Sequence, residues 1–309
     1  VNNVSSLKDP NTFWIASGTS GIKGIQKKNN SYEVILENTN SDTMYPKRNY
    51  NYFMTMHDNK LLVIGGGRDT DRWSRRGTYM KYENGEWYNF NENEINNKFR
   101  NFWDYTGIAI DPNNPDRYFI SSYGEGIVEL KNNEAIQLYD SQNSTLESIA
   151  KLDPLHYVRI GGITFDKNGN LWATNCEVPS LLQVLKANGE WVKFQSSELA
   201  ISYKTDKITI TSDNRKWINC DQGIFIFNEK GTIDDKSDDE SKLYTTFTDA
   251  NGSIDVSGYY CVVEDKTGQV WIGTSRGPII CRNPRNSIDK ISCERIVRTN
   301  NENGEPFYL

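Results

Sequence analysis

The chain has 309 residues, of which 36% are hydrophobic and 12% aromatic, so it can bury a core and is not expected to be disordered. Its formal charge of −6 argues against a nucleic-acid-binding surface built on bulk positive charge. No stretch approaches the ~18 consecutive apolar residues of a membrane helix, and no signal peptide is visible, so we expect no direct membrane insertion.

A strand–turn–strand unit recurs along the chain. Each copy has a short β-rich run, a polar turn of Asp, Asn and Gly, a second strand that starts near a large apolar residue, a loop of small residues and another β-rich strand. In chain order, the large residues of the second strands are Trp14, Leu62, Phe119, Trp172, Trp217 and Trp271. We call them the anchor residues. They lie 45 to 57 residues apart, so six units fill the chain.

Asn-Gly turns join the last two strands of two units. Residues 84–90 read NGEWYNF and residues 188–194 read NGEWVKF. Asn-Gly between β-rich runs is a strong hairpin signal because both residues accept positive φ. Convincing helical periodicity is absent; the best candidate, residues 143–153, is short and ends in Asp-Pro.

Four antiparallel strands per unit at this spacing are typical of a propeller blade. We therefore predict an all-β fold: a β-propeller of four-stranded antiparallel blades, with six visible units that form a ring alone or part of a seven-bladed one. The prediction places residues 1–309 in a single domain. A blade cannot bury both of its faces alone, so we expect the anchor residues to pack between adjacent blades.

The cysteines give no sign of a metal site or of a disulfide framework. Their number is five, which is odd, and none forms a CxxC motif. They are Cys176, Cys220, Cys261, Cys281 and Cys293. We interpret them as small buried strand residues.

The units resemble the two-component regulator propeller repeat. Residues 263–274, VEDKTGQVWIGT, are a near-perfect copy of its pattern, in which an aspartate, a glycine and a tryptophan follow at fixed spacing. The resemblance implies an extracytoplasmic propeller of Bacteroidetes-type bacteria. Many members are the periplasmic sensor halves of hybrid two-component receptors for glycans.

A narrower resemblance covers most of the chain. Residues 228–239, the stretch WIGTSRGPIICRNP at 271–284 and residues 293–296 look like the PorZ family. This resemblance implies a type IX secretion system component at the cell surface that takes part in delivering anionic lipopolysaccharide to secreted proteins. Because that family carries two propellers and a C-terminal β-sandwich, it also implies that this chain is a fragment of a longer protein.

Arginine and aromatic residues gather on one set of loops. The loop between the second and third strands of the second strand–turn–strand repeat, residues 65–77, is a long insertion that carries four arginines and a tryptophan. Aromatic rings stack on sugars, and arginine pairs bidentately with carboxylate or phosphate. We therefore predict an anionic saccharide site at the mouth of the central channel. The candidate ligand-binding residues are Arg72, Trp73, Trp103, Tyr105, Tyr123, Arg159, Tyr259 and Arg276. For any single aromatic, packing in the channel is the alternative.

Enzyme chemistry is hard to build from this sequence, and we predict no catalytic residue, cofactor or metal. Of the two histidines, His57 lies in a turn on the opposite face and His156 has no motif serine nearby. The acidic run 234–240 lacks EF-hand spacing, so it is interpreted as a solvated loop, with a cation site as the alternative.

Three functions stay open. The first is a non-catalytic PorZ-like surface propeller that binds a glycan, such as anionic lipopolysaccharide, or a partner protein of the secretion machinery. The second is a periplasmic sensor domain that binds a carbohydrate. The third is a propeller glycosidase or lyase. The family resemblance implies a periplasmic or cell-surface location, and no nucleic acid partner is expected.

Overall fold

The computed structural model describes residues 2–5, 9–16, 22–37, 46–69, 71–90, 92–199, 204–299 and 306–308. They belong to two compact units, Val1–Leu171 and Trp172–Leu309, which we call unit 1 and unit 2 and describe separately. Strands dominate both units. Within the described ranges, no helix has the length and apolar composition to cross a membrane. The assignment of residues 1–309 to a single domain stays a prediction.

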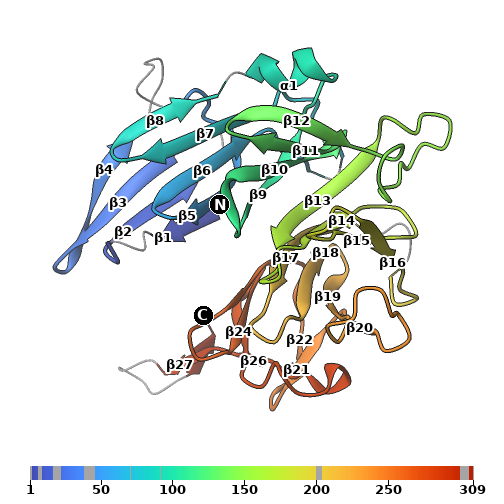
Figure 1. Cartoon of the computed structure of the whole chain (residues 1–309). Coiled ribbons are helices and arrows are strands. Elements are labelled where there is room, and N and C mark those ends of the chain that lie inside the picture. Colours follow the sequence, from blue (N-terminus) through green and yellow to red (C-terminus); the bar gives the residue numbers. More distant parts are fainter. Residues whose placement is uncertain are drawn as a thin grey trace. The chain divides into compact units, whose positions relative to one another are not determined.

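Unit 1 is built from antiparallel sheets whose strands follow one another in chain order (Figure 1). The first comprises β1 (Asn2–Ser5), β2 (Thr12–Ala16), β3 (Ile22–Lys28) and β4 (Ser31–Glu37). The second comprises β5 (Asn51–His57), β6 (Lys60–Gly65), β7 (Thr78–Glu83) and β8 (Glu86–Asn89). The third sheet is larger and includes β9 (Tyr105–Asp111), β10 (Asn114–Gly124), β11 (Gly126–Lys131) and β12 (Glu134–Tyr139). The next strand, β13 (Val158–Phe165), pairs with the end of β10.

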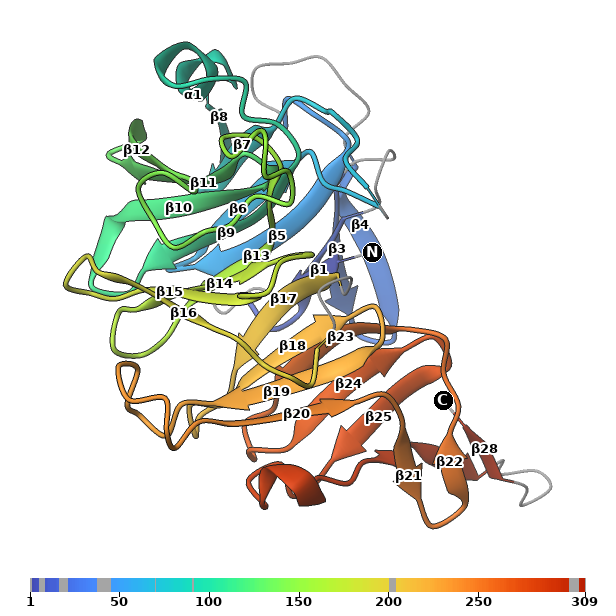
Figure 2. The same cartoon turned by 90° about the vertical axis from the view of Figure 1, so that its right-hand side faces the viewer.

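Unit 2 repeats this order (Figure 2). It starts with β14 (Leu171–Asn175), β15 (Leu182–Leu185) and β16 (Trp191–Phe194). Two four-stranded sheets follow: β17 (Thr205–Ile210), β18 (Lys216–Cys220), β19 (Gly223–Asn228) and β20 (Glu240–Tyr244), then β23 (Tyr259–Glu264), β24 (Val270–Thr274), β25 (Gly277–Cys281) and β26 (Glu294–Arg295). The hairpins are β21 (Phe247–Asp249) with β22 (Gly252–Ile254) and β27 (Val297–Thr299) with β28 (Pro306–Tyr308). The predicted four-strand antiparallel unit is thus confirmed.

An aspartate closes the first turn of the repeat. The carboxylate of Asp265 accepts the backbone N–H groups of Thr267 and Gln269 at 2.8 and 3.1 Å, and the indole Nε1–H of Trp271 at 2.8 Å. The Thr267 hydroxyl donates to the same carboxylate at 2.6 Å, and this bond, together with the others, lowers the pKa of Asp265. Asp166 accepts two backbone N–H groups in the equivalent turn. The spacing from aspartate to tryptophan in the repeat is therefore set by hydrogen bonding as well as by packing.

All the anchor residues except Trp271 are buried, and several pack between neighbouring sheets, as predicted. Trp14 of β2 lies in one apolar cluster with Met54 of the next sheet, and Trp217 of β18 lies in one with Ile272 of β24. Trp217 has no exposed surface. Trp271 of β24 is only half-buried.

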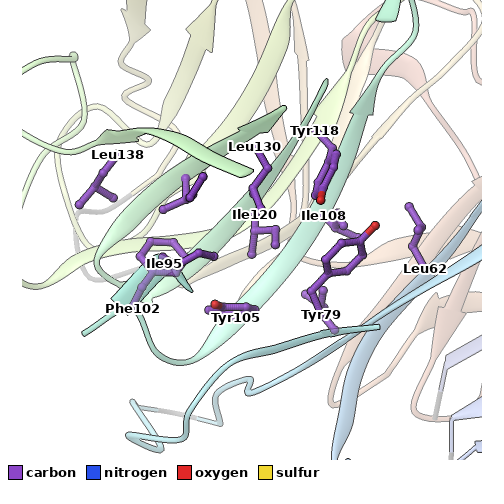
Figure 3. Packing of buried hydrophobic residues seen from close by; sticks show 13 residues of the cluster. Leu62, Tyr79, Ile95, Phe102, Tyr105, Ile108, Tyr118, Ile120, Leu130 and Leu138 are labelled. Carbon is purple, nitrogen blue, oxygen red and sulfur yellow. The ribbon is translucent and has the colours of Figure 1, made fainter. Parts of the chain in front are cut away.

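The expectation that helices are absent is wrong for two short segments of the described residues, an α-helix and the single-turn 3₁₀-helix η2 (Ile288–Lys290). The helix α1 (Glu92–Lys98) follows the second sheet and contacts β12. Its one buried apolar side chain, Ile95, packs in the same cluster as Phe102 and Leu138 (Figure 3). Two turns with a single apolar position carry no periodicity, so the pattern could not reveal this helix. Residues 143–153, the better candidate by sequence, form turns and bends.

The expectation that no cysteines pair is also wrong. Cys281 ends β25 and Cys293 precedes β26, and the two form a disulfide with Cα atoms 4.0 Å apart. An odd cysteine count argues against a framework in which all cysteines pair, but it leaves room for a single bridge. Cys176 and Cys220 are buried, as expected, whereas Cys261 is exposed.

Removal of an anchor side chain should destabilise the fold strongly. We expect Trp217→Ala to lower the free energy of unfolding by about 3–5 kcal/mol, because it opens a large cavity between two sheets. Tyr260→Ala, which truncates an aromatic ring that is 62% exposed, should change it by less than about 1 kcal/mol. Urea unfolding measures both; equal losses would contradict the packing role of the anchor.

The disulfide should stabilise unit 2 by constraining its unfolded chain. Closing a loop of about a dozen residues is worth ~3 kcal/mol in the chain-entropy view, so a reducing agent should lower the urea midpoint. Cys293→Ala should start from the lower midpoint and show no further response to reductant. If the unsubstituted chain is also insensitive to reductant, the bridge does not stabilise the fold.

Candidate functional site

The long loop after β6, residues 65–77, lies against the third sheet. Its backbone forms bridges between Gly66 and Tyr105 and between Arg76 and Trp103. The N–H of Gly67 also donates to the carbonyl of Tyr105 at 2.9 Å. The 65–77 loop therefore lies beside the start of β9, and it places Arg68 over the ring of Tyr123 in β10.

Asp104 fixes this loop. Its side chain is fully buried, and its carboxylate accepts the backbone N–H groups of Ser74 and Arg75 at 2.9 and 2.8 Å. Its own N–H donates to the carbonyl of Arg75 at 2.9 Å. The φ of Asp104 is 52°, a left-handed conformation that Asp tolerates better than most residues. Hydrogen bonds to a buried carboxylate are strong, so they offset the strain and hold the loop.

Glu125 gathers three nitrogen-bearing side chains around one buried carboxylate. Arg72 donates to Oε1 at 3.1 Å, and the Nε of Arg100 donates to Oε2 at 3.0 Å. Nδ1 of His156 lies 2.8 Å from Oε2. Arg100 also pairs with Asp140 at 3.0 Å. Because Glu125 is only 4% exposed, these arginines neutralise a buried charge, and their main role here is to hold the loops together.

A second group surrounds the ring of Tyr123, which has no exposed surface. The guanidinium carbon of Arg68 lies 4.4 Å from the ring centroid and that of Arg159 lies 5.1 Å from it. Arg159 also donates to Oδ1 of Asp71 at 2.5 Å. Two cations therefore meet at one buried ring, and a carboxylate of the 65–77 loop reaches one of them.

A third group is more exposed, and we call it the Trp73–Arg75 platform: Tyr50, Tyr52, Trp73 and Arg75. Trp73 is 40% exposed. The Arg75 guanidinium lies 4.1 Å from the Trp73 ring centroid and 5.7 Å from that of Tyr50, while Tyr52 meets Trp73 edge-on at 6.3 Å. Among the residues that the structure describes, no carboxylate pairs with Arg75. Its positive charge is held by aromatic rings alone.

The structure brings six of the predicted site residues together in unit 1: Arg72, Trp73, Trp103, Tyr105, Tyr123 and Arg159. The remaining two belong to unit 2. The ring of Tyr259 packs against Phe247 at 6.0 Å, and Arg276 is highly exposed, with Asp255 at 4.0 Å. The ligand-binding role of all eight stays a prediction.

Two of the predicted aromatics are core residues in this structure. Tyr105 lies beside Phe102, with ring centroids 5.3 Å apart, and is 2% exposed (Figure 3). A side chain at Gly77 would overlap the Tyr105 ring, so this packing is tight. Tyr105 and Tyr123 thus match the packing alternative. Trp103 is half-buried.

The expected surplus of positive charge is largely cancelled. Arg72 and Arg159 each pair with an acidic side chain, and those acids, Glu125 and Asp71, were not among the predicted site residues. A signal did exist: arginines concentrated on one loop of a net-negative chain require counter-charges nearby. Which acids supply them depends on strands that meet only in the folded chain.

The acidic run 234–240 finds separate protein partners. Asp234 accepts from Lys186 at 3.0 Å, and Asp238 accepts from the Thr232 hydroxyl at 2.9 Å. Burial raises the pKa of Asp239 to about 6. Within the described ranges, no three His, Cys, Asp or Glu side chains converge as a metal ion would require. These contacts favour the interpretation as a polar loop.

Comparison with known proteins supports the resemblance found in the sequence. Residues 245–276 match the model of the two component regulator propeller. PorZ, a surface component of the type-IX secretion system of Porphyromonas gingivalis, superposes with a TM-score of 0.79 and 24% identity over 97% of this chain. This chain spans only 41% of the PorZ chain. No curated protein matches the chain significantly in sequence.

Other solved structures share the fold at lower identity. The extracellular domain of a putative hybrid two component system from B. thetaiotaomicron has a TM-score of 0.61 and 14% identity, over 99% of this chain and 36% of that one. Virginiamycin B lyase from Staphylococcus aureus has a TM-score of 0.58 and 12% identity, over 96% and 88%. The predicted fold class, an all-β β-propeller, is thereby confirmed.

The hold of Asp104 on the 65–77 loop is testable by proteolysis. Asp104→Ala removes the acceptor of two backbone N–H groups, so we expect trypsin to cut after Arg72, Arg75 or Arg76 at least ten times faster than in the unsubstituted chain. Asp116→Ala, which removes an exposed acid from β10, should leave the cleavage rate unchanged. Mass spectrometry of the fragments locates the cuts; a loop equally resistant in both variants is not held by Asp104.

Proposed function

We propose that this chain is a non-catalytic, extracytoplasmic propeller module, PorZ-like in its role at the cell surface, that binds an anionic saccharide at the Trp73–Arg75 platform. One observation carries the proposal. Arg75 is held between the rings of Trp73 and Tyr50 with no carboxylate partner among the described residues, while Trp73 keeps 40% of its surface exposed.

The platform has the chemistry that such a ligand needs. A guanidinium group presents parallel N–H donors that match a carboxylate or phosphate, and no acid in the described ranges pairs with that of Arg75. An exposed indole offers a flat apolar surface for the face of a sugar ring. The Asp104 hydrogen bond to the Arg75 backbone presets the geometry, which reduces the entropy lost on binding.

Two observations support a location outside the cytoplasm. Disulfides persist in oxidising compartments and are rare in the cytosol, and Cys281 and Cys293 form one. The similar solved chains are a surface component of a secretion system and the extracellular domain of a putative hybrid two component system. The first match favours a secretion component that binds a glycan such as anionic lipopolysaccharide, or a partner protein. The second keeps a carbohydrate-binding sensor domain as the alternative.

The environment of the histidines supports a role without catalysis. His156 contacts the buried carboxylate of Glu125, which two arginines already occupy. His57 ends β5, and its Nε2 lies 3.3 Å from the carboxylate of Asp58 in the following turn. Neither imidazole ring is hydrogen-bonded to a serine, threonine or cysteine side chain in the part of the chain that the structure describes. The likeness to a lyase at 12% identity reflects the fold alone.

Binding should depend on both members of the platform. We expect Arg75→Gln and Trp73→Ala each to weaken the affinity for purified anionic lipopolysaccharide by ten- to a hundredfold, since one good contact of this kind is worth about 1–3 kcal/mol. Added salt should weaken binding in the unsubstituted chain and should have less effect in Arg75→Gln. Titration calorimetry at two salt concentrations measures both effects.

A matched control exists on the same sheet. Lys81 lies 4.8 Å from the ring centroid of Tyr88, which is 43% exposed, and it also pairs with Glu83 at 2.8 Å. Lys81→Gln and Tyr88→Ala therefore remove a cation–ring pair whose charge a protein acid already neutralises. These variants should bind as the unsubstituted chain does. Unchanged affinity in Arg75→Gln and Trp73→Ala, with the fold intact, would move the site away from the platform.

A further inference from the structure

The ion pair between Arg159 and Asp71 is unlike the others around the 65–77 loop. The Arg159 side chain is 9% exposed and is held by β13 and the Tyr123 ring, whereas the Asp71 side chain is 69% exposed. The guanidinium therefore belongs to the rigid sheet, while its carboxylate partner reaches it from solvent.

The remaining arginine partners near this loop lie deep in the protein. Glu125, which accepts from Arg72 and Arg100, is 4% exposed. Asp140, the other partner of Arg100, is 8% exposed. Neither carboxylate can leave without exposing a buried cation network, which is costly. Among these pairs, that of Arg159 and Asp71 is the one in which a carboxylate from outside could take the place of the protein's own.

The position of Asp71 in the chain also favours exchange. Its Oδ1 accepts the backbone N–H of Arg72 at 2.8 Å, and a backbone bridge between Arg68 and Arg72 closes the turn around it. The bridge between Arg68 and Arg72 involves the backbone alone, so it does not depend on the Asp71 carboxylate; rotation of that side chain gives up only its hydrogen bond to the Arg72 N–H. An external carboxylate or phosphate that takes the place of Asp71 keeps the buried Arg159 guanidinium paired, while the exposed Asp71 carboxylate returns to water, so the exchange has a small net cost.

We propose that Arg159 and Arg68, both in contact with Tyr123, form a second anion-binding subsite, and that Asp71 occupies this subsite as an internal substitute until a ligand displaces it. The proposal rests on the proposed function in one respect, since the displacing group is taken to be a carboxylate or phosphate of the same anionic saccharide. Asp71 would then reject neutral saccharides and weak anions, because only a ligand with an equivalent charge can replace it.

The test compares two charge-neutralising substitutions in one loop. Asp71→Asn removes the internal competitor, and Asp69→Asn removes an exposed neighbouring carboxylate, so each changes the net charge from −6 to −5. When Asp71 occupies the subsite, the apparent affinity of the chain for an anionic ligand falls in proportion to the fraction of molecules in which the subsite is open. We therefore expect Asp71→Asn to bind oligogalacturonate three- to tenfold more tightly, and Asp69→Asn to stay within twofold. Adding Arg159→Gln to Asp71→Asn should abolish the gain.

Titration with inorganic phosphate tests whether the subsite binds a free anion or only an anionic saccharide. It also separates the failure of this proposal from the failure of the proposed function. The side-chain Nε–Hε resonance of Arg159, assigned by its loss in Arg159→Lys, should shift with phosphate in Asp71→Asn at lower concentration than in the unsubstituted chain. If phosphate shifts it while no saccharide binds any variant, the subsite stands and the saccharide function fails. If saccharides bind the Trp73–Arg75 platform but Asp71→Asn and Asp69→Asn behave alike in both assays, the subsite is overturned and the proposed function stands. Asp71→Ser repeats the test without an amide in the site.

Discussion

A four-stranded sheet cannot cover either of its own faces, and this constraint organises the whole chain. Each sheet supplies a large side chain, such as Trp14 or Trp217, that fills the space against the next sheet. The same dependence brings the loop of one sheet into contact with its neighbour. The 65–77 loop leaves the second sheet, yet Asp104, which precedes the third, supplies the carboxylate that holds it.

Charge is divided in unit 1 between groups that hold the structure and groups that face solvent. Glu125 and Asp104 are buried acids, and the arginine and backbone donors around them satisfy their charge. Once these carboxylates are satisfied, no described acid is left to pair with Arg75, which lies against the rings of Trp73 and Tyr50. A chain with an overall negative charge can in this way present a local cation without an extended basic surface. The counter-charges lie beneath the loop and reduce the long-range field of its arginines.

The fold was predictable because its signals are local and repeated. The spacing of the anchors and the aspartate turns each reflect contacts within one unit or with the next, as Asp265 and Trp271 illustrate. The site was predictable only in part. The arginine-rich loop identified the right region, but the burial of Tyr105 and the pairing of Arg72 with Glu125 depend on strands distant in sequence. Helix α1 and the single disulfide were missed because each rests on one side-chain contact rather than on a pattern.

The way Asp104 holds the 65–77 loop has a consequence for how such chains diversify. The Asp104 carboxylate bonds to the backbone N–H groups of Ser74 and Arg75, so these hydrogen bonds do not depend on which side chains the loop carries. Substitutions at the tip can therefore accumulate while the sheets keep their packing. The ligand preference of the loop can then change while the fold stays the same, much as hypervariable loops vary on the constant scaffold of an immune receptor. Selection could then retune what this surface recognises without first having to find a new fold.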